Sequence, residues 1–105
     1  MKNLILVRGG GDLATGTIYK LRTSGFPVLI LETAAPSAIR RNVAFCEAVY
    51  QGAQTVEDMT CYLAESLEQA QEFLEGGKLT VLVDPEGRSI PSLKPMAVVD
   101  AILAK

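Results

Sequence analysis

An apolar run that passes directly into a glycine cluster constrains the fold of this chain more than any other feature. Residues 4–16 have the sequence LILVRGGGDLATG. The four aliphatic residues predict a buried strand, the glycines predict a turn that no side chain crowds, and the residues from Leu13 onward predict a helix. A strand, a glycine turn and a helix in this order are typical of a nucleotide-binding fold.

The glycine cluster fits the dinucleotide fingerprint G-x-G-x-x-G/A through Gly9, Gly11 and Ala14. In such a motif the first glycine allows a tight turn, the second lets the backbone approach a pyrophosphate, and the small third residue lets the helix pack closely on the sheet. Free N–H groups at the helix start would face the anion. A glycine turn of this kind also occurs where a chain only reverses direction, so the surrounding sequence must decide.

The residues that follow support the fingerprint. Gly25 stands where a helix C-cap is expected, and the run Val28–Glu32 predicts a second buried strand that ends in an acid. Glu32 lies about 20 residues beyond Gly11, where a ribose-binding acid is expected in a dinucleotide fold. Its charge favours NAD over NADP, because a 2′-phosphate would face a carboxylate. The alternative is that Glu32 only ends a strand in water.

The next stretch of sequence predicts one helix and one short strand. Ser37 is a plausible N-cap, and a helix that Gly52 ends should follow it. Four residues should share one packed face of that helix: Ile39, Val43, Cys46 and Tyr50. Arg40 and Arg41 fall in its first turns, where a cation opposes the helix dipole, so an anionic partner and a solvated outer face both remain open. The stretch 55–63 is compatible with helix or strand, and we expect a short strand.

The C-terminal half continues the alternation of strand and helix. Ser66 followed by Gln69 forms a capping-box pattern, which predicts a helix that Gly76 and Gly77 stop. The continuous apolar run 79–83 predicts a strand covered on both faces, and a last apolar segment begins at Val98. We therefore expect an α/β, Rossmann-like fold, with a mostly parallel sheet of about four to five strands and helices on both faces. No internal repeat is present.

Acidic residues stand at or near the predicted strand ends. Glu32, Asp84 and Asp100 occupy such positions, and Asp12 lies in the glycine turn. Ligands of parallel sheets bind beyond the carboxyl ends of the strands, so these acids could face one crevice. They could bind ribose hydroxyls or hold a divalent metal through oxygen. Alternatively, they cap helices and stay hydrated.

Length and composition narrow the function further. The chain has 105 residues, which suits one domain, and 49% of them are hydrophobic, which argues against disorder. A net charge of −2 argues against nucleic-acid binding. The N-terminal apolar run is too short for a signal peptide or a membrane span, so we expect a cytoplasmic protein without a membrane partner. Two cysteines and no histidine exclude a cysteine–histidine catalytic pair and make a zinc site or a disulfide framework a poor interpretation.

Four ordered sequence blocks resemble the YqeB family, proteins of the selenium-dependent molybdenum hydroxylase system. These blocks are RGGGDLATG, AIRRNVAFCEAVYQG with TVE, LTVLVDP and VVDAILAK. The resemblance covers nearly the whole chain. It implies a Rossmann-like accessory protein for maturing such a hydroxylase, but no known reaction. Members of the family are usually longer, so we expect residues 1–105 to be a single domain that is truncated at its C-terminus relative to the family.

By position, the family's glycine block falls on residues 8–16, its arginine pair on Arg40 and Arg41, and its later blocks on Asp84 with Pro85 and on Asp100 with Lys105. The leading hypothesis is a module that binds a nucleotide or a molybdopterin-type nucleotide without turnover. We expect Glu32 to contact ribose, and Arg8 or Arg40 to meet additional negative charge. The expected cofactor-binding residues are Arg8, Gly9, Gly10, Gly11, Asp12, Leu13, Glu32, Arg40, Arg41, Asp84 and Asp100.

Two other classes of function remain open. An NAD-dependent oxidoreductase, or its cofactor-binding half, is one, although the chain lacks histidine and offers no clear acid–base pair. A non-catalytic interaction protein is the other, because the edges of a small parallel sheet need cover. On the same ground we expect a homo-oligomer, and a molybdenum hydroxylase subunit is a further candidate partner.

Overall fold

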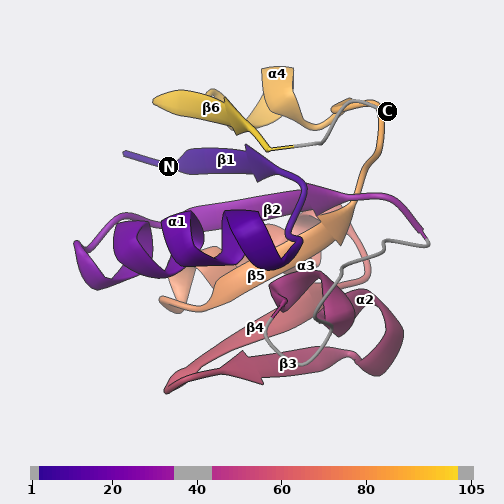
Figure 1. Ribbon diagram of the computed structural model, residues 1–105. Coiled ribbons are helices and arrows are strands. Elements are labelled where there is room, and N and C mark those ends of the chain that lie inside the picture. Colours follow the sequence, from indigo (N-terminus) through magenta and orange to yellow (C-terminus); the bar gives the residue numbers. More distant parts are fainter. Residues whose placement is uncertain (1–2, 35–43, 102–105) are drawn as a thin grey trace.

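The computed structural model describes residues 3–34 and 44–101, apart from the side chains of Asp12 and Leu13. Its elements form an α/β domain with one six-stranded sheet (Figure 1). The strands are β1 (Ile5–Arg8), β2 (Val28–Glu32), β3 (Ala53–Val56), β4 (Met59–Ala64), β5 (Leu79–Val83) and β6 (Ala97–Asp100). The helices are α1 (Asp12–Thr23), the 3₁₀ turn η2 (Phe45–Glu47), α2 (Ala48–Gln51), α3 (Leu67–Glu75) and α4 (Ile90–Leu93).

The sheet is mostly parallel, with strand order β3-β4-β5-β2-β1-β6. Among the strands that the structure describes, only β3 and β4 pair in antiparallel fashion. The strand count exceeds the expected four to five, because the stretch 55–63 belongs to a hairpin of two strands rather than to one short strand. The hairpin turns at Glu57, whose φ is 56°. No glycine or asparagine marks that turn in the sequence, so the usual hairpin signal is missing.

Two apolar layers cover the two faces of the sheet. On one face α1, η2 and α2 pack against alternate residues of the central strands, with Ile18, Ile30 and Phe45 fully buried. On the other face α3 and α4 pack against the remaining residues, including Leu6 and Leu29. Figure 1 shows α1 in front of the sheet and α3 behind it. We call these the α1 face and the α3 face.

Local capping signals give the helix ends that the sequence predicts. At the end of α1, the Gly25 N–H donates to Arg22 O at 3.0 Å and the Phe26 N–H donates to Leu21 O at 3.1 Å. This pair of bonds is the Schellman arrangement of a helix C-terminus. At the start of α3, the Ser66 hydroxyl accepts from the Gln69 N–H at 3.1 Å, as the capping-box pattern predicts.

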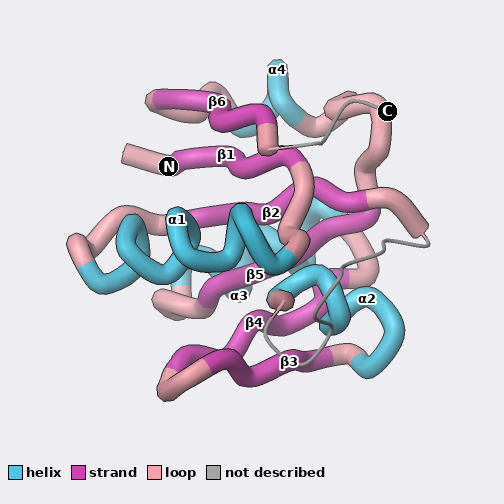
Figure 2. The backbone as a smooth tube through the Cα atoms, viewed as in Figure 1, coloured by secondary structure: helices cyan, strands magenta, loops and turns pink. Residues whose placement is uncertain are grey.

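The predicted long helix that Gly52 ends is not continuous. Residues 35–43, which include Ser37, Ile39 and Val43, lie outside the described residues. Ala44 is extended, with φ −117° and ψ 125°, and only then do η2 and α2 follow, as Figure 2 shows. Within this segment Cys46 is buried, but Tyr50 is 49% exposed and so does not share a packed face with it.

The order of the strands reverses at β1. Strand β2 pairs with one side of β1, whereas β6 pairs with the other side, and both pairings are parallel. In the register, Arg8 lies beside Leu31 of β2 and beside Asp100 of β6, and Glu32 lies beside Val83 of β5. The carboxyl ends of the parallel strands β5, β2, β1 and β6 therefore form one edge, and we call this the carboxyl edge. None of the helices in the described ranges is long and apolar enough to cross a membrane.

Candidate functional site

The glycine turn connects the end of β1 to the start of α1 at the carboxyl edge. Gly9 has φ 94°, a conformation that side chains disfavour, and its N–H donates to Leu31 O at 2.9 Å. Gly11 is the N-cap of α1, with φ −66° and ψ −179°. Ala14 is buried between α1 and the sheet, in the position of the small third residue of the fingerprint. The predicted strand, turn and helix are thus present in the predicted order.

Glu32 lies against the glycine turn rather than in water. Its side chain alternates with Val28 and Ile30 and so belongs to the α1 face, and the residue is 8% exposed. One carboxylate oxygen accepts from the Gly10 N–H at 2.7 Å, and the other accepts from the Thr33 N–H at 3.0 Å. A carboxylate has about four lone-pair sites, and these two hydrogen bonds occupy two of them.

The 3₁₀ turn η2 packs directly on the glycine turn. The Cys46 N–H donates to Gly10 O at 2.9 Å, and the Phe45 N–H donates to the Thr15 hydroxyl at 3.1 Å. These two N–H groups bond to the glycine turn and to α1 instead of to acceptors within a helix, so the predicted helix does not extend through Ala44. A β-carbon on Gly10 would lie 3.3 Å from Cys46 N. The dinucleotide fingerprint predicts that the backbone at Gly11 approaches a ligand closely. In the structure, Gly10 is the glycine that another backbone segment approaches closely.

The first turn of α1 begins at Gly11, an N-cap that has no side chain with which to cap the helix. The Thr15 N–H donates to Gly11 O at 3.0 Å, which by its i to i−4 geometry is the first helical hydrogen bond among the described residues of α1. The preceding N–H groups have no acceptor inside a helix by geometry. Asp12 and Leu13 contribute backbone to this turn, and their side chains lie outside the description. An anion at this position would also meet the positive end of the helix dipole.

Arg8 lies on the opposite face from Glu32. Its side chain follows Leu4 and Leu6 in the alternation of β1 and therefore belongs to the α3 face. Its Nη1 lies 3.6 Å from the Asp100 Oδ2, and its Nη2 donates to Pro85 O at 3.4 Å. The side chains of Arg8 and Asp100 are 30% and 60% exposed. Arg8 is thus a partly accessible cation at the point where the strand order reverses.

Asp84 follows β5 at the same edge, but its carboxylate is hydrogen-bonded to residues of its own loop. Its carboxylate accepts from the Ser89 hydroxyl, from the Ser89 N–H at 2.8 Å and from the Arg88 N–H at 2.9 Å. Burial opposes ionisation, yet the hydrogen bonds from Ser89 and Arg88 outweigh it and lower the pKa of Asp84 below its ordinary value. The carboxylate therefore stabilises the turn that precedes α4.

The structure brings some of the predicted site residues together and leaves others apart. Arg8, Asp100 and the glycine turn meet at the carboxyl end of β1, and Glu32 joins them from the α1 face. Arg40, Arg41 and Lys105 lie outside the described residues. The described residues contain no group of three or more acidic or cysteine side chains suited to a metal ion.

Two features near the turn escaped the sequence analysis. Thr15 donates its hydroxyl hydrogen to Gly11 O at 2.8 Å while it accepts from Phe45, so it joins the glycine turn to η2. Glu47, in η2, is a carboxylic acid that is only 5% exposed. A threonine among the buried positions of α1 was a usable signal for the first feature. Nothing in the local sequence distinguishes Glu47 from a surface glutamate.

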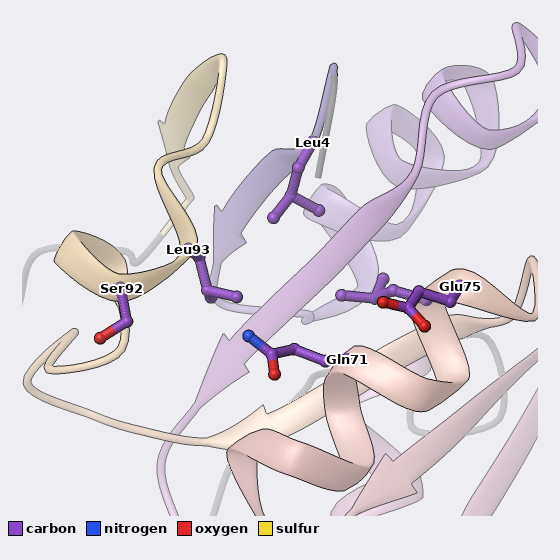
Figure 3. A pocket seen from close by; sticks show the side chains of 6 residues that line it. Leu4, Gln71, Glu75, Ser92 and Leu93 are labelled. Atoms are coloured by element: carbon purple, nitrogen blue, oxygen red, sulfur yellow. The ribbon is translucent and has the colours of Figure 1, made fainter.

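A hollow of about 320 Å³ lies away from the glycine turn. It opens between α3 and α4, near the amino end of β1, as Figure 3 shows. Apolar side chains and a polar rim line it: Leu4, Leu74, Leu93, Gln71, Glu75 and Ser92. It contains none of the predicted site residues. The glycine turn lies at the other end of β1, so we assign the two features separately.

The cysteines make no site of their own. Cys46 and Cys61 are both buried. Burial, together with the proximity of Cys46, raises the pKa of the Cys61 thiol far above its ordinary value. Cys61 is thus held as a neutral thiol in the core, which makes it a poor nucleophile.

The chain is similar in sequence to a known protein. The chain is 46% identical over 102 residues, or 97% of its length, to the uncharacterized protein YqeB of Escherichia coli strain K12. The match shows similarity to one part of that protein. The chain spans 19% of the length of that YqeB protein, so most of the relative has no counterpart here. No protein-family model matches the chain, and no solved structure matches it. The name of the relative assigns no activity. A function can therefore be proposed only from the geometry of the glycine turn and the resemblance of the sequence blocks.

Proposed function

We propose that this chain is a nucleotide-binding module that holds the phosphates of its ligand at the glycine turn. The observation that carries the proposal is the first turn of α1, which follows β1 directly and makes no side-chain cap. It stands at the strand where the sheet order reverses. In open α/β sheets, ligands bind at such a reversal, beyond the carboxyl ends of the strands.

The strand order supports a Rossmann-like interpretation. The consecutive neighbours β5, β2, β1 and β6 follow the order 3-2-1-4 of a dinucleotide-binding half when the β3–β4 hairpin is set aside. In this interpretation the hairpin is an insertion at the edge beyond β5. The glycine turn then occupies the position of the phosphate-binding turn.

The residues at the turn fit a nucleotide with one restriction. The N–H groups of the first α1 turn suit a phosphate or pyrophosphate, and Glu32 keeps acceptor sites for ribose hydroxyls. The Gly10 N–H, however, already donates to Glu32. The phosphate would therefore bind to the α1 end of the turn, with the Glu32 carboxylate beside it. A 2′-phosphate in the same place would meet that carboxylate, which favours NAD over NADP among the redox dinucleotides.

The wider role that we propose follows the resemblance to YqeB. We infer an accessory protein of a selenium-dependent molybdenum hydroxylase system, which binds a nucleotide or a molybdopterin-type nucleotide and contacts a hydroxylase subunit. The 46% identity to YqeB shows similarity to one part of that protein only, and the role itself rests on the resemblance of the sequence blocks. In this role the chain holds its ligand without a chemical step.

Titration calorimetry and thermal unfolding with NAD, ATP and CTP test the binding. We expect saturable binding of at least one nucleotide, and a ligand at 100 times its Kd should stabilise the fold by about 2.7 kcal/mol. Glu32→Gln keeps an acceptor for the Gly10 N–H but loses the charge, so the affinity for NADP should rise relative to that for NAD. Glu72→Ala, an exposed change on α3, is the control and should leave that ratio unchanged. If no nucleotide stabilises the protein, the module does not bind nucleotides.

A specific observation favours self-association as a second candidate function. All four residues of β6 are exposed, and no strand in the described residues lies beyond it. Met96, Val98 and Val99 are 54%, 44% and 36% exposed. An apolar edge strand is a common route to pairing with a second copy. A homo-oligomer through β6 should appear as a dimer in light scattering, and a monomer at every concentration would exclude it.

A further inference from the structure

The guanidinium of Arg8 is held loosely at the carboxyl edge. Its two contacts with described residues, at 3.6 Å to Asp100 and 3.4 Å to Pro85 O, are longer than the 2.7–2.9 Å typical of strong charge-assisted hydrogen bonds. A guanidinium carries five N–H donors in a planar fork that matches an oxyanion. The Arg8 side chain is 30% exposed, so some of its N–H donors can reach a ligand.

Arg8 and the glycine turn both lie at the end of β1, but the Arg8 side chain lies on the α3 face and helix α1 packs on the α1 face. Helix α1 packs on the α1 face, together with Ile30 and Val81. Arg8 instead follows Leu6 on the α3 face and contacts Asp100 of β6. A ligand that used both the α1 amides and Arg8 must cross the carboxyl end of β1, between β2 and β6. A mononucleotide bound on the α1 side does not need Arg8.

We propose that Arg8 binds a second oxyanion of the ligand, carried beyond the pyrophosphate, and that Asp100 is the internal carboxylate that this oxyanion displaces. This inference rests on the proposed nucleotide-binding function. It specifies the ligand class as a dinucleotide whose distal half carries a carboxylate or phosphate. In the absence of such a group, the Asp100 carboxylate neutralises Arg8 across the β1–β6 pair.

A matched pair of ligands tests the proposal by calorimetry. NAD and its nicotinic acid analogue share the pyrophosphate and differ by a carboxamide against a carboxylate in the distal half. We expect the wild-type protein to bind the nicotinic acid analogue about tenfold more tightly, the effect of one charge-assisted hydrogen bond. Arg8→Gln should abolish that preference. Asp100→Asn should strengthen it about threefold, because the competing carboxylate is gone.

The control changes an exposed ion pair of the same kind. Arg88 and Glu86 lie 3.0 Å apart in the loop after β5, with side chains 80% and 68% exposed. Arg88→Gln and Glu86→Gln should leave the ratio of the two affinities unchanged. Because the readout is a ratio, a modest loss of stability in any variant does not alter it.

Each outcome bears on a different statement. Equal affinity of the wild type for both dinucleotides overturns the second oxyanion site alone and leaves the nucleotide-binding function standing. An equal loss of both affinities in Arg8→Gln assigns Arg8 to the shared pyrophosphate and also overturns the inference. If neither dinucleotide binds to the wild type while a mononucleotide does, the ligand does not span the edge. If no nucleotide binds, both proposals fail.

Discussion

Gly10 lies between two neighbours that leave little room for a side chain. A β-carbon built on it would come within 3.1 Å of the Ile30 Cγ2 and within 3.3 Å of Cys46 N. Its N–H and carbonyl are both bonded, to Glu32 and to Cys46. The backbone therefore cannot move away from either neighbour without loss of a hydrogen bond.

Two glycine substitutions should consequently have opposite effects on stability. Gly10→Ala should lower the free energy of unfolding by about 1–3 kcal/mol, since a methyl group enters a packed site. Gly16→Ala, on the exposed side of α1 with nothing within 4 Å, should raise it by about 0.5–1 kcal/mol through helix propensity. Urea unfolding measures both. A Gly10→Ala protein as stable as the wild type would mean that η2 does not pack on the turn.

The fingerprint predicted the outline of the glycine turn but not its internal contacts. Gly9, Gly11 and Ala14 have the turn, helix start and packing positions that local spacing implies. Local spacing carries no information on Gly10, because its constraint comes from Cys46, a residue in a different element. The hydrogen bond from Gly10 to Glu32 is likewise a tertiary contact between two strand ends. Such contacts arise only when the sheet has formed.

At the scale of elements, the sequence predicted best where the signals are local. β2 and β5 have the predicted bounds, and α3 begins at its predicted cap. The hairpin of β3 and β4 was missed because Glu57 takes a positive φ without a glycine. The prediction of one continuous helix ending at Gly52 was wrong, because Ala44 is extended. The next two N–H groups donate to α1 and to the glycine turn instead of to acceptors within a helix.

The turn between β5 and α4 depends on an ionised carboxylate. Since the pKa of Asp84 is lower in the folded protein than in the unfolded chain, the unfolded state binds more protons as the pH falls through this range. The stabilisation by Asp84 is thus present above its unfolded pKa of about 3.8 and is lost as the pH falls through the lower folded value.

A pH series on Asp84→Asn checks this element. The difference in free energy of unfolding between wild type and Asp84→Asn should be largest near neutral pH and should shrink as the pH falls below about 4. Ser89→Ala, which removes the hydroxyl donor, should raise the pKa of Asp84 in an NMR titration. A difference that is the same at all pH values would show that the charge of Asp84 does not stabilise the turn.

At the scale of the whole molecule, the two edges of the sheet differ in chemistry. The β3 edge carries polar residues such as Gln54 and Thr55, and it belongs to a short antiparallel hairpin. The β6 edge runs parallel to β1 and exposes Val98 on the α3 face and Val99 on the α1 face. Strands in parallel sheets are normally covered on both faces. The β6 edge is therefore the side of the molecule that lacks cover among the described residues.

A lysine introduced at each edge of the sheet should distinguish self-association through β6 from a general effect of added surface charge. A two-fold axis normal to the sheet through Val98 would set Val98 against its copy and Val99 against Ala97, so both faces gain apolar pairs. Val98→Lys should shift the dimer to monomer in light scattering over a concentration series. Thr55→Lys, the matched change at the β3 edge, should leave the dimer intact. Dissociation by Thr55→Lys alone would place the contact at the wrong edge for this proposal.

Glu32 and Arg8 place a carboxylate and a guanidinium on opposite faces at the same end of the sheet. One side of β1 presents a carboxylate beside backbone amides, and the other presents a guanidinium beside β6. An elongated ligand with hydroxyls at one end and negative charge at the other would then bind with its hydroxyls on the Glu32 side and its negative charge on the Arg8 side. In the proposed binding mode, this placement would give such a ligand one preferred orientation across the end of the sheet.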